Sequence, residues 1–372
     1  MKLTLQIKLL PSEEQFSSLK RTLIEANTAC NEISKNAFTK KLYNQFKLHK
    51  EVYYTIKKSF NLSAQMIVRC ISKVTDSYKI DKKVQRKFRP LGAITYDPRI
   101  LSYTKDGISL WTVDGRLKGM KFICHNQKYI PYIKGEADLV LKNGKFYIFQ
   151  TIEVPEEDIR NVEEFIGCDF GLTDIVVTSD EKKYSADWLN EYREKRQRIR
   201  SSVQRKGTKS AKRLLKRLSG REKTTATIQN HTISKTIVED AKSKGRGISI
   251  EDLTGIRFTS KRRNKKFRTK LGKWNFSQLR SFIEYKSQLN GVPLIVVNPH
   301  YTSQMCNECK YIGKRTNKVF KCTNKKCKVK TIDADVNASK VISSLGGSVN
   351  NPESSTMYCV LHSVVSSKAS TL

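Results

Sequence analysis

The sequence predicts a multidomain protein of the α/β and α+β classes, in which an antiparallel β region and a helical segment precede an α/β domain. Three observations lead to this prediction. The chain has 372 residues, which is enough for two or three domains. Glycine and proline are absent from residues 12–89, where the apolar pattern is helical. After Pro155, segments typical of strands alternate with segments typical of helices.

The first strand and the first helix follow from local patterns. Apolar residues occupy every second position from Leu3 to Leu9, which predicts a half-buried strand. The residues from Ser12 to Gln15 form a capping-box pattern that begins a helix. Helical structure is expected from there to about residue 88. We therefore expect a small helical domain over residues 11–88.

Residues 91–155 have the pattern of antiparallel hairpins. Their β-type runs lie beside dipeptides that supply the positive φ angles of tight turns. These dipeptides are Asp106-Gly107, Asp114-Gly115 and Asn143-Gly144. With the first strand, the hairpins are expected to close a small β-barrel over residues 1–10 and 89–160, into which the helical domain is inserted.

The second half of the chain predicts a mixed sheet with helices packed on it. The first two strands of this half are expected to pair as a hairpin. From Gly346 onward the chain is rich in Ser and Asn and almost uncharged, so residues 346–372 are expected to form a disordered tail. The expected strands are 165–168, 175–178, 247–250 and 294–297, and the expected helices are 190–245, 276–289 and 336–344.

Four of the nine cysteines are clustered near the C-terminal end. Two residues separate Cys306 from Cys309, and four separate Cys322 from Cys327. Two short knuckles joined by a hairpin-length loop supply four thiolates for a tetrahedral zinc ion. A closed set of four thiolates leaves no open position for chemistry, so the zinc ion is expected to be structural. The alternative, four buried free thiols, fits poorly because the neighbouring residues are largely Lys and Asn.

The charge of the chain predicts its partner. The sequence has 71 Lys and Arg against 35 Asp and Glu, a formal net charge of +36. Such a chain repels itself unless a polyanion neutralises it, so nucleic acid is the expected partner. No apolar run approaches 18 residues, and we therefore expect no membrane partner. The scattered remaining cysteines are typical of the reducing cytoplasm and not of a disulfide framework.

Two basic stretches are the candidate nucleic-acid contacts. Residues 193–223 carry fourteen Lys or Arg, and residues 257–273 carry nine with no acid. A charge run is commonly a solvated face, but an imbalance this large favours contact with phosphates. The candidate nucleic-acid-binding residues are Arg205, Lys212, Arg213, Lys261, Arg262, Arg263, Lys265, Lys266 and Arg268.

Three acidic residues stand at the ends of predicted elements in the second half. Asp169 and Glu251 each end a strand, and Asp335 opens the last helix. Carboxylates that converge repel one another unless a divalent cation lies between them. Two such ions about 4 Å apart can activate a water and stabilise the leaving oxygen in phosphodiester cleavage. By itself this pattern is weak, because an acid at a strand end is more often a cap or a turn residue.

Several motifs in residues 164–342 resemble, in the same order, those of the TnpB family of transposon-encoded RNA-guided nucleases, the ancestors of the type V CRISPR effectors. The residues from Asn298 to Cys306 resemble the segment that precedes the zinc ribbon of that family. Leu9 to Gln15 resembles its start more faintly. Several ordered motifs are far more specific than any one. The stretches that look like the three RuvC motifs are Ile166 to Leu172 (IGCDFGL), Ser249 to Leu253 (SIEDL) and Asp333 to Ala338 (DADVNA).

The resemblance implies a domain organisation. A RuvC-like, RNase H-like α/β nuclease core would cover residues 161–300 and 331–345, interrupted by a zinc ribbon over residues 301–330. The barrel would be the wedge-like domain of the family, and the helical segment its recognition domain. The sequence departs from the family pattern in two places, both in the ribbon. The second cysteine pair is usually separated by two residues, and Lys310 stands where glycine is common.

The resemblance also implies Asp169, Glu251 and Asp335 as the catalytic acids, binding Mg²⁺ or Mn²⁺. Asp335 is preferred to Asp333 because the family motif has its acid two residues before the Asn. Asp333 and Asp252 are then expected to make local hydrogen bonds.

The implied function is that of an RNA-guided DNA endonuclease that cuts next to a short flanking motif by a two-metal-ion mechanism. Its partners would be a guide RNA and a double-stranded and single-stranded DNA target, in the cytoplasm and associated with the nucleoid. Two other hypotheses stay open. One is a nuclease-inactive RNA-guided DNA-binding protein, such as a transposon-derived repressor, and the other is a guide-free zinc-ribbon DNA-binding protein or transposase accessory factor. Three clustered carboxylates count against the first, and RNA of defined size bound to the protein would count against the second.

Overall fold

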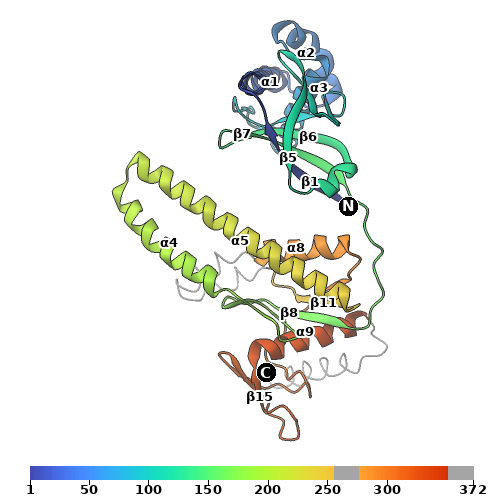
Figure 1. Cartoon of the computed structure of the whole chain (residues 1–372), viewed down its shortest axis with the longest axis vertical. Helices are drawn as coiled ribbons and strands as arrows, with labels where there is room; N and C mark the ends of the chain where they lie inside the picture. The colour runs from blue at the N-terminus through green and yellow to red at the C-terminus, as the bar shows by residue number, and fades with distance from the viewer. Residues whose placement is uncertain (255–275, 351–372) are drawn as a thin grey trace. The chain divides into compact units, whose positions relative to one another are not determined.

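The computed structural model describes residues 1–254 and 276–350 (Figure 1). The chain divides into two compact units, Met1–Pro155 and Glu156–Leu372. The division falls after Pro155 and not after residue 160, where the sequence led us to expect it. Among the described residues, no helix is both long enough and apolar enough to cross a membrane.

The first unit is built on a seven-stranded antiparallel sheet with the order β2-β6-β7-β1-β5-β4-β3. Strands β2 and β3, at the two ends of this order, are consecutive in the chain, so the sheet is nearly a barrel. No ladder pairs them within the described part of the chain. The three predicted turn dipeptides lie at the turns that join β3 to β4, β4 to β5 and β6 to β7. The strands are β1 (Lys2–Leu10), β2 (Ile94–Tyr96), β3 (Leu101–Thr104), β4 (Gly107–Thr112), β5 (Gly115–Cys124), β6 (Ile133–Lys142) and β7 (Lys145–Glu153), and a short 3-10 helix, η1 (Gln127–Tyr132), precedes β6.

Three helices, α1 (Glu13–Thr39), α2 (Gln45–Ser59) and α3 (Ala64–Ile80), follow β1. The predicted capping box begins α1, since Ser12 and Gln15 exchange side-chain and backbone hydrogen bonds. The helical prediction is wrong beyond Ile80.

The segment after α3 is held by side chains of α1. The Asn31 amide donates to the carbonyl of Phe88 and its oxygen accepts from the N–H of the same residue. The Ser34 hydroxyl donates to the carbonyl of Arg86 at 2.7 Å. These side chains satisfy backbone groups that a helix would otherwise have satisfied.

The second unit contains a five-stranded mixed sheet with the order β10-β9-β8-β11-β12. Strands β8, β9 and β10 are antiparallel neighbours, whereas β11 and β12 run parallel to β8. The predicted mixed sheet and its hairpin pair are therefore confirmed. The strands are β8 (Phe165–Asp169), β9 (Asp174–Thr178), β10 (Lys183–Ser185), β11 (Gly247–Glu251) and β12 (Leu294–Val297).

Helices cover both faces of this sheet (Figure 1). Helices α5 and α8 pack on one face, where Ile248 and Ile250 of β11 meet Ile237 and Ile283. Helix α9 lies on the other face, where Val341 packs in a separate cluster with residues of β12. The helices of this unit are α4 (Asp187–Lys206), α5 (Lys209–Ser243), α8 (Phe276–Leu289) and α9 (Ala334–Asn350).

Two helix boundaries differ from the sequence prediction. The helix expected over residues 190–245 is broken at Gly207, which has a φ of +64°, and Thr208 caps α5 by accepting from the N–H of Ala211. The last helix continues to Asn350, so the expected tail is wrong for Gly346–Asn350. Residues 351–372 of that tail lie outside the described residues.

Candidate functional site

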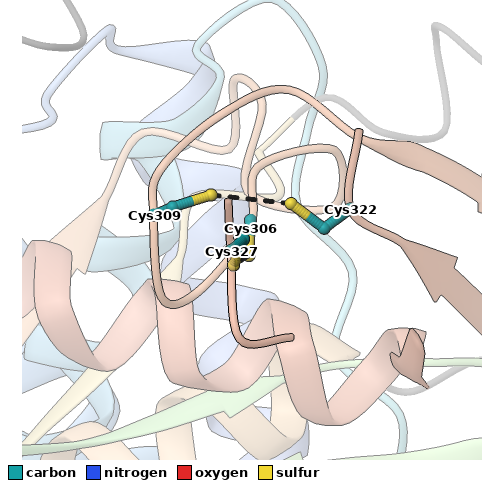
Figure 2. A group of neighbouring side chains, drawn as sticks. All are labelled: Cys306, Cys309, Cys322 and Cys327. Carbon is teal, nitrogen blue, oxygen red and sulfur yellow. Dashed lines mark hydrogen bonds between the residues drawn. The ribbon is translucent and has the colours of Figure 1, made fainter. Parts of the chain in front are cut away.

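Four cysteine thiols meet between the two knuckles of the ribbon (Figure 2). Their sulfur atoms all lie within 4.8 Å of one another. The Sγ atoms of Cys309 and Cys322 are 3.5 Å apart, and those of Cys306 and Cys327 are 3.8 Å apart. Four sulfurs at about 2.3 Å from a tetrahedral zinc ion would be about 3.8 Å apart from one another. The donor set and its spacing therefore fit zinc.

A small three-stranded antiparallel sheet and a small hydrophobic core position these thiols in the ribbon. Its strands are β13 (Lys314–Thr316), β14 (Val319–Lys321) and β15 (Thr331–Asp333). Phe320 of β14 is fully buried against the cysteines. The longer second knuckle turns back on itself, because the N–H of Cys327 donates to the carbonyl of Asn324. Both sulfurs of that knuckle consequently still reach the cluster.

Lys310, the other departure from the family pattern, has a φ of +63°. A left-handed backbone favours glycine, the residue that the family resemblance leads us to expect at this position. The Lys310 ammonium donates to the carbonyl of Asn307 in the first knuckle and to the hydroxyl of Ser344 on α9. These two contacts offset the backbone strain.

Asp169 and Glu251 stand together at one edge of the five-stranded sheet. Strands β8 and β11 are parallel, Ile250 lies beside Cys168 in their register, and each acid is the next residue of its strand. Successive side chains of a strand point to opposite faces. Ile250 packs with α5 and α8, so Glu251, and likewise Asp169, faces the side that α9 covers.

Helix α9 approaches this face closely because small residues line the contact. A Cβ added to Gly167 would lie 2.0 Å from the carbonyl oxygen of Ser339, and one added to Gly346 would lie 2.6 Å from the Cβ of Ser249. The Ser249 hydroxyl donates to a backbone carbonyl of α9 at 2.9 Å. This close packing brings the first turn of α9, and with it Asp335, to the edge that holds the other two acids.

The three carboxylates interact electrostatically. Burial, followed by the charges of Glu251 and Asp335, raises the pKa of Asp169 to about 8. Burial also raises the pKa of Glu251, which is 8% exposed. Within the described residues, only the four cysteines form a set with ligand atoms all within 4.8 Å. The acids thus influence one another without closing into such a set.

Two cations of the ribbon partly neutralise this charge, and the sequence analysis did not identify them. Arg315 of β13 pairs with Asp335 and also opposes the rise in the pKa of Asp169 and Glu251. The Lys318 ammonium lies 2.6 Å from the carboxylate of Asp174. Among so many basic residues, no local pattern distinguishes these two.

Asp333 and Asp252 make local hydrogen bonds, as expected. Asp333 caps α9 by accepting from the N–H groups of Asp335 and Val336 at 3.0 and 3.1 Å, and it pairs with Lys183. Asp252 accepts from the N–H of Thr254 and forms an ion pair with Arg280 of α8.

Three of the candidate nucleic-acid contacts lie near the tip of the α4–α5 hairpin. Arg205, Lys212 and Arg213 are exposed on either side of Gly207. In the part of the chain that the structure describes, no acidic side chain forms an ion pair with them. The other six candidates, Lys261, Arg262, Arg263, Lys265, Lys266 and Arg268, lie outside the described residues.

Comparison with known proteins identifies the family. A family model described as the Cas12f1-like TNB domain matches residues 276–342, which contain the four clustered cysteines and Asp335. The TnpB-like protein MJ0751 of Methanocaldococcus jannaschii is 31% identical over 278 residues, which cover 72% of this chain and 93% of that protein. The chain belongs to the TnpB-like family. The family predicted from the RuvC-like motifs is thereby confirmed.

The TnpB-like chain also matches parts of longer proteins. It is 31% identical over 214 residues to the CRISPR-associated endodeoxyribonuclease Cas12f1 of Syntrophomonas palmitatica, covering 51% of this chain and 42% of that protein. A solved Cas12f1-sgRNA-target DNA complex aligns over 92% of this chain and 99% of that chain, with 16% identity and a TM-score of 0.40.

Proposed function

We propose that this TnpB-like protein is an RNA-guided DNA endonuclease that cuts next to a short flanking motif. The observation that carries the proposal is that Asp169, Glu251 and Asp335 gather at one edge of a mixed β-sheet. A binding module has no use for three carboxylates whose mutual repulsion destabilises the fold. The name of the Cas12f1 relative, an endodeoxyribonuclease, supports the same activity.

The three acids suit Mg²⁺ or Mn²⁺, because both are hard cations that prefer carboxylate oxygens. When bound, such ions activate a water and stabilise the leaving oxygen of a phosphodiester. Asp169 and Glu251 would hold the ions from neighbouring strands, and Asp335 from α9. A cation also offsets the burial and the charges of Glu251 and Asp335 that raise the pKa of Asp169.

The four cysteines would hold a structural zinc ion, which supports the acid site from outside. The ribbon that the ion stabilises carries Arg315 and Lys318, and these two cations contact Asp335 and Asp174. Zinc therefore contributes to the position of the acids without taking part in the reaction.

The partners in this proposal are a guide RNA and its DNA target. A net charge of +36 is more than a short DNA contact needs, which favours a structured RNA bound over much of the chain. Base pairing would then select the target, while the protein would recognise backbone shape and the flanking motif.

Cleavage of a matched and a mismatched duplex, with and without the RNA that co-purifies with the protein, tests the proposal. We expect double-strand cleavage of the matched duplex only when both RNA and Mg²⁺ or Mn²⁺ are present. The Asp169→Ala protein is the control, which should bind the matched duplex without cutting it. Equal cleavage of both duplexes without RNA would identify a non-specific nuclease. Guided binding without cleavage by the wild type would favour the repressor hypothesis.

The basic tip of the α4–α5 hairpin offers a separate measurement. Replacing Arg205, Lys212 and Arg213 with Gln is expected to weaken binding to every sequence alike. We plot the logarithm of the binding constant against the logarithm of the salt concentration. The slope of this plot should become less steep by roughly 0.7 to 0.9 for each phosphate that the variant no longer neutralises. Lys235→Gln is the control, because Lys235 lies 3.7 Å from Glu239 and its charge is already paired. An unchanged salt dependence in the triple variant would remove these residues from the interface.

A further inference from the structure

Helix α4 carries a row of planar side chains to which the proposed function assigns no role. Trp188, Tyr192 and Arg196 follow one another at intervals of four residues, which places them on one side of the helix. The ring centroids of Trp188 and Tyr192 are 6.1 Å apart, with an angle of 23° between the ring planes. The Arg196 guanidinium carbon lies 5.1 Å from the centroid of the Tyr192 ring. These three residues form what we call the stacking ladder.

The buried side chain of α4 is Leu189 and not Trp188. The Trp188 side chain is 59% exposed, whereas the next residue, Leu189, is 5% exposed and supplies the buried contact. Arg193 and Arg200 tie α4 to α5 through ion pairs with Glu222. An indole left in water forgoes the stabilisation that burial ordinarily provides, so the position of Trp188 favours a role in binding.

The stacking ladder begins near the edge of the sheet that holds the acids. Across β9, Lys183 of β10 and Asp169 of β8 both stand opposite Val177. Lys183 also pairs with Asp333, next to the first turn of α9. Strand β10 ends two residues later at Ser185, and α4 begins at Asp187. The start of α4 therefore lies at the same edge of the sheet as the acids.

The chemistry of the ladder selects unpaired bases. Bases stack on aromatic rings and guanidinium planes irrespective of their sequence, while nearby cations bind the phosphates. Helix α4 carries seven Lys or Arg against three acids, which supplies those cations. A duplex hides the faces of its bases, so only a single strand can use the ladder. The strand expected at the acid site is the DNA strand to be cut.

We propose that the stacking ladder binds unpaired bases of the DNA strand entering the acid site and positions that strand for cleavage. The identity of the strand rests on the proposed function, but the binding of unpaired bases does not require cleavage. Trp188 is in this view a positioning residue.

The binding of short strands to the full-length protein tests the ladder. We compare an oligothymidine strand, an abasic strand of the same length and a duplex, at high salt to weaken the phosphate contacts. Trp188→Ala is expected to weaken oligothymidine binding by roughly 5- to 150-fold, and to leave the other two affinities unchanged. Trp188→Phe, which keeps a flat ring, should retain most of the affinity. Ile228→Ala is the control, because Ile228 is 61% exposed on α5 and carries no ring.

An unchanged oligothymidine affinity in Trp188→Ala would overturn the proposal, and so would an equal loss for all three ligands. Photocross-linking then separates DNA from RNA as the occupant. DNA containing 5-iodouracil should cross-link to the peptide of Trp188 even when the protein carries its own RNA. Loss of this cross-link upon RNA binding would assign the ladder to the RNA and overturn the proposal.

The experiments distinguish a failure of the stacking-ladder proposal from a failure of the proposed function. If guided cleavage is absent but oligothymidine binding depends on Trp188, only the proposed function fails. If guided cleavage occurs and Trp188→Ala binds oligothymidine like the wild type, only the ladder fails.

Discussion

The second unit contains two sets of potential metal ligands that the chain assembles in different ways. The thiols come from one short stretch, Cys306 to Cys327, and their sulfurs already lie within 4.8 Å of one another. The carboxylates of Asp169, Glu251 and Asp335 come from two strands and a helix that are far apart in the sequence. Local chain geometry makes the first set, whereas the packing of α9 on the sheet makes the second.

This difference fits the roles that we propose, which are a structural site for the thiols and a reactive site for the carboxylates. The thiols can meet with less repulsion, because burial raises the pKa of Cys306 and Cys322 and a metal displaces their protons on binding. The carboxylates repel one another, and Arg315 neutralises only part of their charge. A closed set of thiolates holds an ion in place, and an open set of acids can exchange an ion or admit a substrate. The expected effects of mutations in the two sets differ accordingly.

Removal of one acid is expected to have the largest effect on activity. Asp169→Ala, Glu251→Ala and Asp335→Ala should each lower cleavage by more than the roughly 10- to 100-fold typical of removing an outer-shell partner of a metal. Nucleic-acid binding should change little, because it rests on distant cations. Single-turnover cleavage and equilibrium binding measure the two effects.

Asp333→Ala is the matched control for the third acid. Asp333 caps α9, so its loss should lower stability by about 1 kcal/mol and preserve most of the cleavage. If Asp335→Ala cleaved at the wild-type rate and Asp333→Ala did not cleave, the third acid would be Asp333 and not Asp335.

Disruption of the thiol set is expected to have the largest effect on structure. Cys322→Ser should lose the zinc ion, whose binding contributes roughly 10 kcal/mol or more to folding in small zinc domains. Elemental analysis should find one zinc per wild-type chain and none in the variant, and limited proteolysis should cut the variant within residues 300–335. Cys124→Ser, at a buried cysteine outside the ribbon, should keep its zinc. Zinc-free wild-type protein with an intact ribbon would contradict the prediction.

Displacement of α9 should affect the acids and spare the thiols. In Gly346→Ala the new Cβ would lie 2.6 Å from the Cβ of Ser249, and such overpacking typically costs about 1–3 kcal/mol. Cleavage should slow while the zinc content stays constant. Gly220→Ala on α5 is the control, since nothing lies within 4 Å of its Cβ and the change should stabilise the helix by about 0.5–1 kcal/mol. Thermal melts that shift equally in both variants would argue against the close approach of α9.

A smaller effect is expected where the ribbon contacts the acids. Arg315→Ala removes the partner of Asp335 and should destabilise the metal-free protein by about 1 kcal/mol. Mn²⁺ should then raise the melting temperature of the variant more than that of the wild type, because in the variant the ion neutralises the charge of the acids that Arg315 neutralises in the wild type. Lys314→Ala, at an exposed position of the same strand, should respond to Mn²⁺ like the wild type. An identical response of Arg315→Ala would show that Arg315 and the ions do not share a site.

Features that depend on neighbouring residues could be predicted from the sequence alone. The capping box of Ser12 and Gln15, the three hairpin turns and the helix Phe276–Leu289 are all present at the expected residues. The four cysteines also cluster as their spacing predicted. In each case the interacting groups lie a few residues apart, or in one short hairpin, so the local pattern already contains both partners.

Features that depend on distant partners were decided by the tertiary structure. Helix α3 ends at Ile80 because side chains of α1 bind the segment that follows, and α9 continues to Asn350 because Gly346 packs against Ser249. The acids could be named from a family resemblance, but their pattern alone did not distinguish ligands from caps. Arg315 could not be found at all. Its role arises from a contact between the ribbon and the acid site. Neighbouring residues in the sequence do not show which charges a distant segment brings to a site.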